Sequence, residues 1–312
     1  MSNQPGGVQQ PQSVGSDTPT RSEIDLHTHT TASDGLLSPT ALVELASARG
    51  LRILGITDHD STGGVEEALQ AAAERNVEVW PGVEISTDVP GAEVHLLGYF
   101  VDLHDNTFQR TLRALRDGRR DRAHRMVERL AQLGIPVEWS RVVELAGTGA
   151  IGRPHVAQAM VEKGYVRSVT EAFDLYLGRK GPAYIERYKL TPDQAAELVR
   201  QAGGLPVLAH PVIVGAEISG AEAATEPRLP PHIEQALPGL IRHGLVGIEA
   251  YYPDYPAALT DFLLDLAAQQ GLVATGGSDF HGGGLSADLG SVYVPWEAVE
   301  GLRRLRTYRG TT

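Results

Sequence analysis

Short apolar runs and longer amphipathic runs alternate along the first hundred residues of the chain. Four short runs are typical of buried strands, and residues 39–49 and 65–75, which lie between them, show the apolar period of helices. Ser38 is suited to cap the first of these helices, and Pro39 to its first position. The alternation predicts parallel strands joined by crossover helices. The four runs are residues 23–29 (EIDLHTH), 51–60 (LRILGITDHD), 77–86 (VEVWPGVEIS) and 92–100 (AEVHLLGYF).

This pattern is interrupted over residues 106–200, which are helical in character and contain no convincing buried strand. Strand-like runs resume at residues 204–211 (GLPVLAHP), 244–253 (GLVGIEAYYP) and 272–282 (LVATGGSDFHG), with a helix expected over residues 256–270. We therefore predict an α/β fold in which two parts of a parallel barrel or sheet, residues 22–105 and 201–312, are separated by a helical insertion.

Composition narrows the function classes. Residues 1–21 are rich in Gly, Pro, Ser and Gln, have no apolar core like that of a signal peptide, and are expected to form a disordered tail. No apolar run approaches the roughly 18–20 residues that a membrane-spanning helix needs. The absence of cysteine excludes thiolate metal sites, and the net charge of −12 argues against a stable DNA partner. We expect a cytoplasmic protein.

Imidazole and carboxylate groups stand at the ends of nearly all the predicted strands. The carboxyl ends of parallel strands meet at one rim, and residues i and i+2 of a strand face the same side, as in the pairs His27/His29 and Asp279/His281. Nitrogen and oxygen ligands of this kind suit Mn²⁺, Fe²⁺ or Zn²⁺, and so many of them favour two or three ions over one. The candidate ligands are His27, His29, Asp34, His59, Glu84, His95, His210, Asp279 and His281.

Seven motifs in order resemble the PHP (polymerase and histidinol phosphatase) family of metal-dependent phosphoesterases. They are DLHTHTTASDG, GITDHDSTGG, GVEIS, HLLGY, LAHP, GIEAYYP and GGSDFHG, and the resemblance runs from about residue 23 to residue 306. It implies a distorted (β/α)7 barrel with up to three metal ions at its C-terminal rim. The resemblance implies one ion on His27, His29, Glu84 and Asp279, a second on Glu84, His95 and His210, and a third on Asp34, His59 and His281.

Two motifs of the helical insertion, GRPHVAQAM (residues 152–160) and YLGRKGPAY (residues 176–184), resemble a narrower branch of that family. This branch contains bacterial 3′,5′-nucleoside bisphosphate phosphatases, some of which are also 5′→3′ exonucleases on short RNA. Its insertion caps the barrel mouth and contacts phosphate. The resemblance implies substrate contacts from Arg153 and His155, and from Arg179 and Lys180. The alternative is that Arg153 pairs with a surface acid and His155 only begins a helix.

The ligand set implies phosphoester hydrolysis by a hydroxide that bridges two divalent ions, with Mn²⁺ favoured. Asp279 or His281 would then pass a proton to the leaving oxygen. The expected substrate is a small nucleoside bisphosphate or a 5′-phosphorylated short RNA. Two alternatives stay open: a phosphatase for histidinol phosphate or another small monoester, and a non-catalytic metal-binding PHP module.

Several polar residues allow more than one interpretation. Arg119 and Arg122 interrupt the apolar stripe of a predicted helix, so they either reach into the cleft or cover a seam with their stems while their heads stay in water. Glu249 ends a predicted strand, where the pocket and ordinary packing explain it equally well. The Tyr251–Tyr252 pair either stacks on a nucleobase or packs against the protein.

Overall fold

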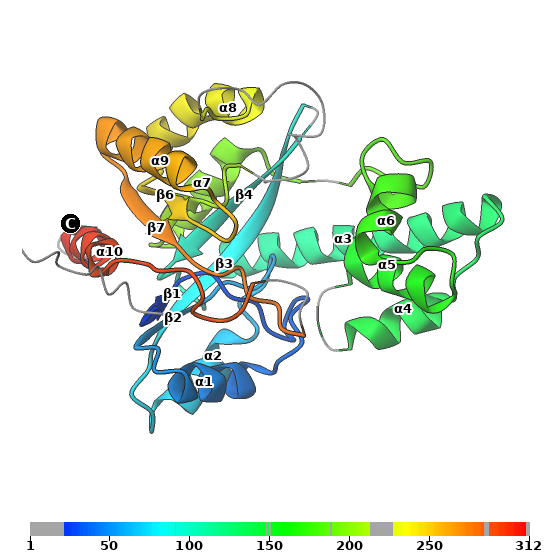
Figure 1. Ribbon diagram of the computed structural model, residues 1–312, viewed down its shortest axis with the longest axis horizontal. Helices are drawn as coiled ribbons and strands as arrows, with labels where there is room; N and C mark the ends of the chain where they lie inside the picture. Colours follow the sequence, from blue (N-terminus) through cyan, green and yellow to red (C-terminus); the bar gives the residue numbers. More distant parts are fainter. Residues whose placement is uncertain are drawn as a thin grey trace, which may run out of the picture.

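The computed structural model describes residues 22–90, 92–147, 149, 151–187, 189–212, 227–283 and 287–309. The predicted tail, residues 1–21, lies outside the described residues. At the centre of Figure 1, seven strands form a sheet in the order of the chain. They are β1 (Ile24–Asp25), β2 (Ile53–Ile56), β3 (Glu78–Val89), β4 (Ala92–Tyr99), β5 (Leu205–Leu208), β6 (Gly247–Tyr251) and β7 (Val273–Gly276).

The sheet nearly closes into a barrel, because the chain that follows β1 contacts the chain that follows β7. Thr28 and Phe280 form a parallel bridge, and the amide of His29 donates to the carbonyl of Phe280 at 2.9 Å. This arrangement confirms the predicted seven-stranded α/β barrel. It also brings the residues that follow β1 and β7 to one rim.

The prediction that all strands run parallel was wrong for β4, which pairs antiparallel with both β3 and β5. Only residues 90 and 91 separate β3 from β4, and a parallel crossover needs a dozen or more residues. The remaining strand pairs are parallel. The reversal places the beginning of β4 beside the end of β3, so that Ser86 lies opposite His95. Residues near the start of β4 therefore reach the same rim as the ends of the other strands.

Helices cover the outside of the barrel (Figure 1). The predicted start of the first helix is confirmed, because the Ser38 hydroxyl accepts a hydrogen bond from the Ala41 amide at 3.1 Å. Among the described residues, no helix is both long and apolar enough to cross a membrane. These helices are α1 (Pro39–Ala48), α2 (Val65–Ala72), α7 (Pro192–Gln201), α8 (Pro231–Arg242), α9 (Ala257–Gln270) and α10 (Trp296–Arg309).

The other helices follow β4 and form a lobe at the side of the barrel (Figure 1). The first of them has 27 residues, and at 1.5 Å per residue its length is about 40 Å. Its first half packs on the barrel, where Phe108 and Leu112 share a cluster with Val83. We call these helices the helical insertion: α3 (Asn106–Gln132), α4 (Trp139–Ala146), α5 (Arg153–Glu162), α6 (Val169–Ala172) and the single π-helical turn η1 (Phe173–Leu177).

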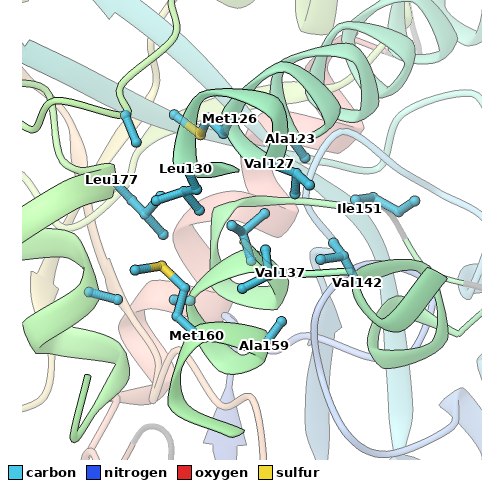
Figure 2. Close-up of a cluster of buried hydrophobic side chains, with 14 of the residues drawn as sticks. Ala123, Met126, Val127, Leu130, Val137, Val142, Ile151, Ala159, Met160 and Leu177 are labelled. Carbon is cyan, nitrogen blue, oxygen red and sulfur yellow. The ribbon is translucent and has the colours of Figure 1, made fainter. Parts of the chain in front are cut away.

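The helical insertion has a hydrophobic core of its own (Figure 2). Met126 and Leu130 of α3 meet Met160 of α5 and Leu177 of η1 in this core. By contrast, α7, which the prediction included in the insertion, contacts β3, β4 and β5. The insertion also touches the barrel rim, since a Cβ atom at Gly149 would lie 2.1 Å from the carbonyl oxygen of Ser33. The core of the insertion therefore holds α5 in place at the rim.

We expect Leu130→Ala to lower the free energy of unfolding by about 2–5 kcal/mol, because Leu130 is fully buried in the core of the insertion. Leu133→Ala, three residues away, is the matched control, because Leu133 is 40% exposed and its truncation should cost less than about 1 kcal/mol. Denaturant unfolding measures both values. Equal losses in the two variants would contradict the core shown in Figure 2.

Candidate metal centre

The structure brings the nine predicted ligands together at the rim of the barrel. Eight of them form three groups in which the potential ligand atoms lie within 4.8 Å of one another, and the ninth, His210, lies 3.0 Å from Glu84. Two of the groups contain the ligand sets predicted for the first and third ions, with His29 added to the third. The groups are His27, His29, Glu84 and Asp279; His29, Asp34, His59 and His281; and His59, Glu84 and His95.

Glu84, at the centre of these groups, is 1% exposed and has histidine nitrogens around both of its carboxylate oxygens. Burial raises the pKa of its carboxyl group, but the surrounding histidines outweigh burial and hold the pKa well below its usual value. Glu84 is therefore a bridging candidate. Its Oε2 lies 3.3 Å from His27 Nε2, 3.2 Å from His29 Nε2 and 3.0 Å from His59 Nδ1, and its Oε1 lies 2.7 Å from His95 Nδ1 and 3.0 Å from His210 Nε2.

The carboxylates of the site raise the pKa values of two of its histidines. Burial lowers the pKa of His29, but Asp279 and Glu84 outweigh it and raise that pKa to about 10. Burial also lowers the pKa of His95, but Glu84 outweighs burial and raises that pKa to about 9. Burial dominates at His59, whose pKa falls to about 3, so this imidazole stays neutral and can offer its lone pair to a cation.

Five buried polar atoms of the groups have no hydrogen-bond partner among the described residues. Buried polar atoms are rarely left unpaired in folded proteins, so a cluster of them indicates a missing ligand. All five are nitrogen or carboxylate oxygen atoms, which suit Mn²⁺, Fe²⁺ or Zn²⁺. The residues present therefore fit divalent metal ions. The atoms are His27 Nε2, His29 Nε2, His59 Nδ1, Asp34 Oδ1 and Glu84 Oε2.

Glu249 and Tyr252 orient two candidate ligands, His27 and Asp279, through hydrogen bonds. The Nδ1 atom of His27 donates to Glu249 at 3.1 Å, which leaves Nε2 to face Glu84, and Glu249 also accepts from the backbone amide of His210 at 2.9 Å. The hydroxyl of Tyr252 donates to Asp279 Oδ2 at 2.7 Å. The structure therefore places Glu249 and Tyr252 behind the ligands, where hydrogen bonds hold the imidazole and the carboxylate in position.

Two buried aspartates lie in the loops of the rim: Asp58 fixes one loop by hydrogen bonds, and Asp60 has an unusual backbone conformation. Asp58 accepts from the amide of Thr30 at 2.7 Å and from the hydroxyl of Ser33 at 2.6 Å, which fixes the loop that carries Asp34. Asp60 has a positive φ of 50°, and two candidate ligands, His210 and Asp279, also have positive φ. Non-glycine residues adopt this conformation at a cost, so the surrounding hydrogen bonds must maintain it.

Arg119 and Arg122 of α3 point into the protein, and the interpretation that their heads stay in water was wrong. The Nε atom of Arg119 donates to Asp60 at 2.6 Å, and its Nη2 donates to Ser86. The side chain of Arg122 is 2% exposed, and its closest ion pair is with Glu93, 4.0 Å away. The middle of α3 therefore places two guanidinium groups beside the metal centre.

Three of the four predicted substrate residues line a cavity beside the metal centre. A cavity of about 530 Å³ is lined by His95 and His210 of the centre together with Arg153, Arg179 and Lys180. Arg153 contacts both carboxylate oxygens of Glu93 at 3.0 Å. Its partner is thus an acid of the cavity wall. Arg179 pairs with Asp88 and, at 3.4 Å, with Glu186.

His155 lies at the first turn of α5, where its Nδ1 accepts a hydrogen bond from the Gly152 amide at 3.0 Å. Burial lowers the pKa of His155, and Arg119 lowers it further against the influence of Asp34. The ring is therefore neutral, and its proton is on Nε2. The structure supports the interpretation that His155 begins a helix, and it leaves Nε2–H available as a donor.

Sequence reasoning missed two residues of the cavity region, Glu93 and Lys189. The Nζ atom of Lys189 lies 2.5 Å from Glu93 Oε1. Glu93 precedes His95 by two residues in β4, so strand alternation could have placed both on one face. No comparable pattern marks Lys189, because it lies outside the named strands and helices and only the fold brings it to Glu93.

The nearly closed α/β barrel has, at its rim, clustered histidines and carboxylates that fit divalent metal ions. The PHP domain model matches residues 25–201, and the chain belongs to the PHP domain family. The sequence is 34% identical to the 5′-3′ exoribonuclease Rnm of Salmonella typhimurium, over 82% of this chain and 84% of that protein. It is 33% identical to the 3′,5′-nucleoside bisphosphate phosphatase of Chromobacterium violaceum, over 84% of this chain and 88% of that protein.

The fold is similar to a solved structure from Bifidobacterium adolescentis, a protein proposed to be a metal-dependent phosphoesterase. The TM-score is 0.79 and the identity 32%, and the match covers 91% of this chain and 96% of that one.

Glu84→Gln should reduce the metal content more than Asp34→Asn does, because Glu84 belongs to two of the three groups and Asp34 to one. Elemental analysis after loading with Mn²⁺ and desalting measures the bound metal, and chelation should lower the melting temperature of the wild type. His124→Ala is the control, since His124 lies outside the groups and its side chain is 48% exposed. A Glu84→Gln protein with full metal content would refute a bridging role for Glu84.

Proposed function

We propose that the protein is a divalent-metal-dependent phosphoesterase that removes the 3′-phosphate from nucleoside 3′,5′-bisphosphates. One observation carries the proposal: His95 and His210 of the metal centre line the same cavity as Arg153, Arg179 and Lys180. A substrate with two phosphates can thus place one at the metal centre and the other among cationic side chains. The phosphatase of Chromobacterium violaceum, which matches most of this chain, supports this choice of substrate.

We assign two or three ions, with Mn²⁺ preferred, to the nine ligands, and we assign substrate contacts to Arg153, His155, Arg179 and Lys180. Bound divalent ions supply a nucleophile at neutral pH and neutralise charge that develops on phosphoryl oxygens. The chain itself positions the groups around the phosphoryl oxygens. Glu249 orients His27, Tyr252 orients Asp279, and the cations of the cavity hold the second phosphate.

Proton delivery to the leaving ribose oxygen falls to Asp279 or His281 in this proposal. Their side chains are 21% and 19% exposed, the highest values among the nine candidate ligands, so they lie closest to an entering substrate. His281 Nδ1 donates to the carbonyl oxygen of Asp279 at 2.8 Å, which fixes the ring and leaves Nε2 facing Asp34 at 3.5 Å. These two catalytic roles are our prediction.

A second candidate activity is the trimming of short RNA from a phosphorylated 5′ end. The exoribonuclease of Salmonella typhimurium favours it, because that relative matches 82% of this chain. Both candidate substrates carry a terminal phosphate that the same cationic side chains could hold. The expectations of a cytoplasmic location and of no stable DNA partner also remain predictions.

With Mn²⁺, the purified protein should release the 3′-phosphate of adenosine 3′,5′-bisphosphate faster than the phosphate of AMP or of histidinol phosphate. The cavity cations hold a second phosphate, and only the bisphosphate offers one beside the scissile group. A 5′-phosphorylated oligoribonucleotide in the same assay tests the second candidate. Preferred turnover of histidinol phosphate would favour that alternative, and no turnover with Mn²⁺, Fe²⁺ or Zn²⁺ would leave only the non-catalytic module.

Arg153→Ala should raise the KM for the bisphosphate by about 10–100-fold, because a hydrogen bond to a charged group is worth roughly 1.5–3 kcal/mol. The KM for a generic ester such as p-nitrophenyl phosphate should change little. Arg141→Ala is the control, because Arg141 forms a surface pair with Glu162 away from the cavity. Equal effects of Arg153→Ala on both substrates would remove Arg153 from recognition of the second phosphate.

A further inference from the structure

Cationic side chains outnumber carboxylates around Glu93, which lines the cavity beside the metal centre. Lys189 and Arg153 contact Glu93 directly, and Arg122 lies 4.0 Å from it. Behind them, Arg119 and Arg187 share Asp60 at 2.6 and 3.6 Å. Lys189 also pairs with Asp88 at 3.3 Å, so five cationic side chains face three carboxylates in a chain whose net charge is −12. A surplus of this kind, held largely out of water, attracts anions.

Arg122 is the least satisfied of these cations. Its Nε and Nη1 atoms are buried and have no hydrogen-bond partner among the described residues. Burial, followed by the charges of Arg153 and Arg119, lowers the pKa of Arg122 to about 9. A buried charge of this kind lowers the stability of the ligand-free protein, because no hydrogen bond replaces the water that it has lost. The position of Arg122 is explained if a bound ligand supplies acceptor atoms for its Nε and Nη1 atoms.

Glu93 has the position and chemistry of a substitute for such a ligand. Its two oxygens accept from Arg153 and Lys189, and its side chain is 24% exposed on the wall of the 530 Å³ cavity. Its Oε2 lies 3.8 Å from Nε2 of His95, so the carboxylate is next to the metal centre. A carboxylate has two oxygens and one charge. A terminal phosphate has three oxygens and up to two charges, and it can satisfy Arg122 as well.

We propose that Glu93 is a built-in competitor for the second phosphate of the substrate: it occupies a subsite formed by Arg122, Arg153 and Lys189 and leaves this subsite when a phosphate binds. The proposal rests on the proposed function, since it assumes that substrates carry a second phosphate. The free energy needed to displace Glu93 weakens the binding of every anion by the same factor. Only ligands that make several strong contacts then bind, and the product is released more readily.

Inorganic phosphate is the probe, titrated by calorimetry at pH 8 into protein freed of metal with a chelator. Glu93→Gln should bind phosphate about tenfold more tightly than the wild type, because the competing charge is gone. Arg122→Met should bind it about tenfold more weakly. The controls are Glu162→Gln, whose carboxylate pairs with Arg141 at the surface, and Arg125→Met, which changes an exposed arginine of α3. Both should bind phosphate as the wild type does.

Melting temperatures in phosphate-free buffer are a second readout. If Arg122 and Glu93 only stabilised the fold, the pattern described next would not be seen. Arg122→Met should melt at or above the wild-type temperature, because it removes a buried charge whose Nε and Nη1 atoms have no hydrogen-bond partner among the described residues. Glu93→Gln should melt lower, and added phosphate should restore its stability. Phosphate binding by Glu93→Gln that is equal to or weaker than wild-type binding would overturn the proposal. So would an Arg122→Met protein that melts lower and binds phosphate normally.

The two hypotheses fail separately. Phosphate binding is measured without metal and without turnover, so an inactive protein that shows the predicted binding pattern would refute the proposed function and keep the subsite. An active phosphatase without that pattern would refute only the role of Glu93.

Discussion

The sharing of one buried carboxylate is the constraint on which the rest of this structure depends. Glu84 faces five histidine nitrogens, and these come from the loops after β1 and β2, from β4 and from the loop after β5. A cluster of this kind is stable only when each imidazole has one defined orientation and the carboxylate stays ionised. The positive φ of His210 and Asp279, the hydrogen bond that Glu249 accepts and the one that Tyr252 donates all serve this requirement.

Much of the fold and of the candidate site could be predicted from the sequence, because both follow from local rules. Strand ends meet at one rim, and alternate residues share a face, so these two rules alone were enough to place His27, His29 and Asp279 together. The direction of β4 was predicted wrongly, since an apolar run does not show its direction. The short connection at residues 90–91 was the available clue.

The cluster of cations around Glu93 was harder to predict, because no local rule brings these residues together. Arg122 comes from a long helix and Lys189 from a segment outside the regular elements, and they meet at Glu93 only in the folded protein. The apolar stripe of the helix singled out Arg122, whereas the sequence around Lys189 is that of an ordinary surface residue, and such residues are exposed in most proteins. Burial of these charges therefore depends on how the helical insertion packs onto the barrel.

The barrel closes between its first and last strands, and this has a consequence for the order in which the protein matures. One ligand group contains His27 and His29, which follow β1, and Asp279, which follows β7. An ion held by this group ties together parts of the chain separated by roughly 250 residues, and cross-links across long loops constrain the unfolded chain most. Translation must pass Asp279 before that group exists. An ion bound there would therefore stabilise only chains in which the barrel has already closed.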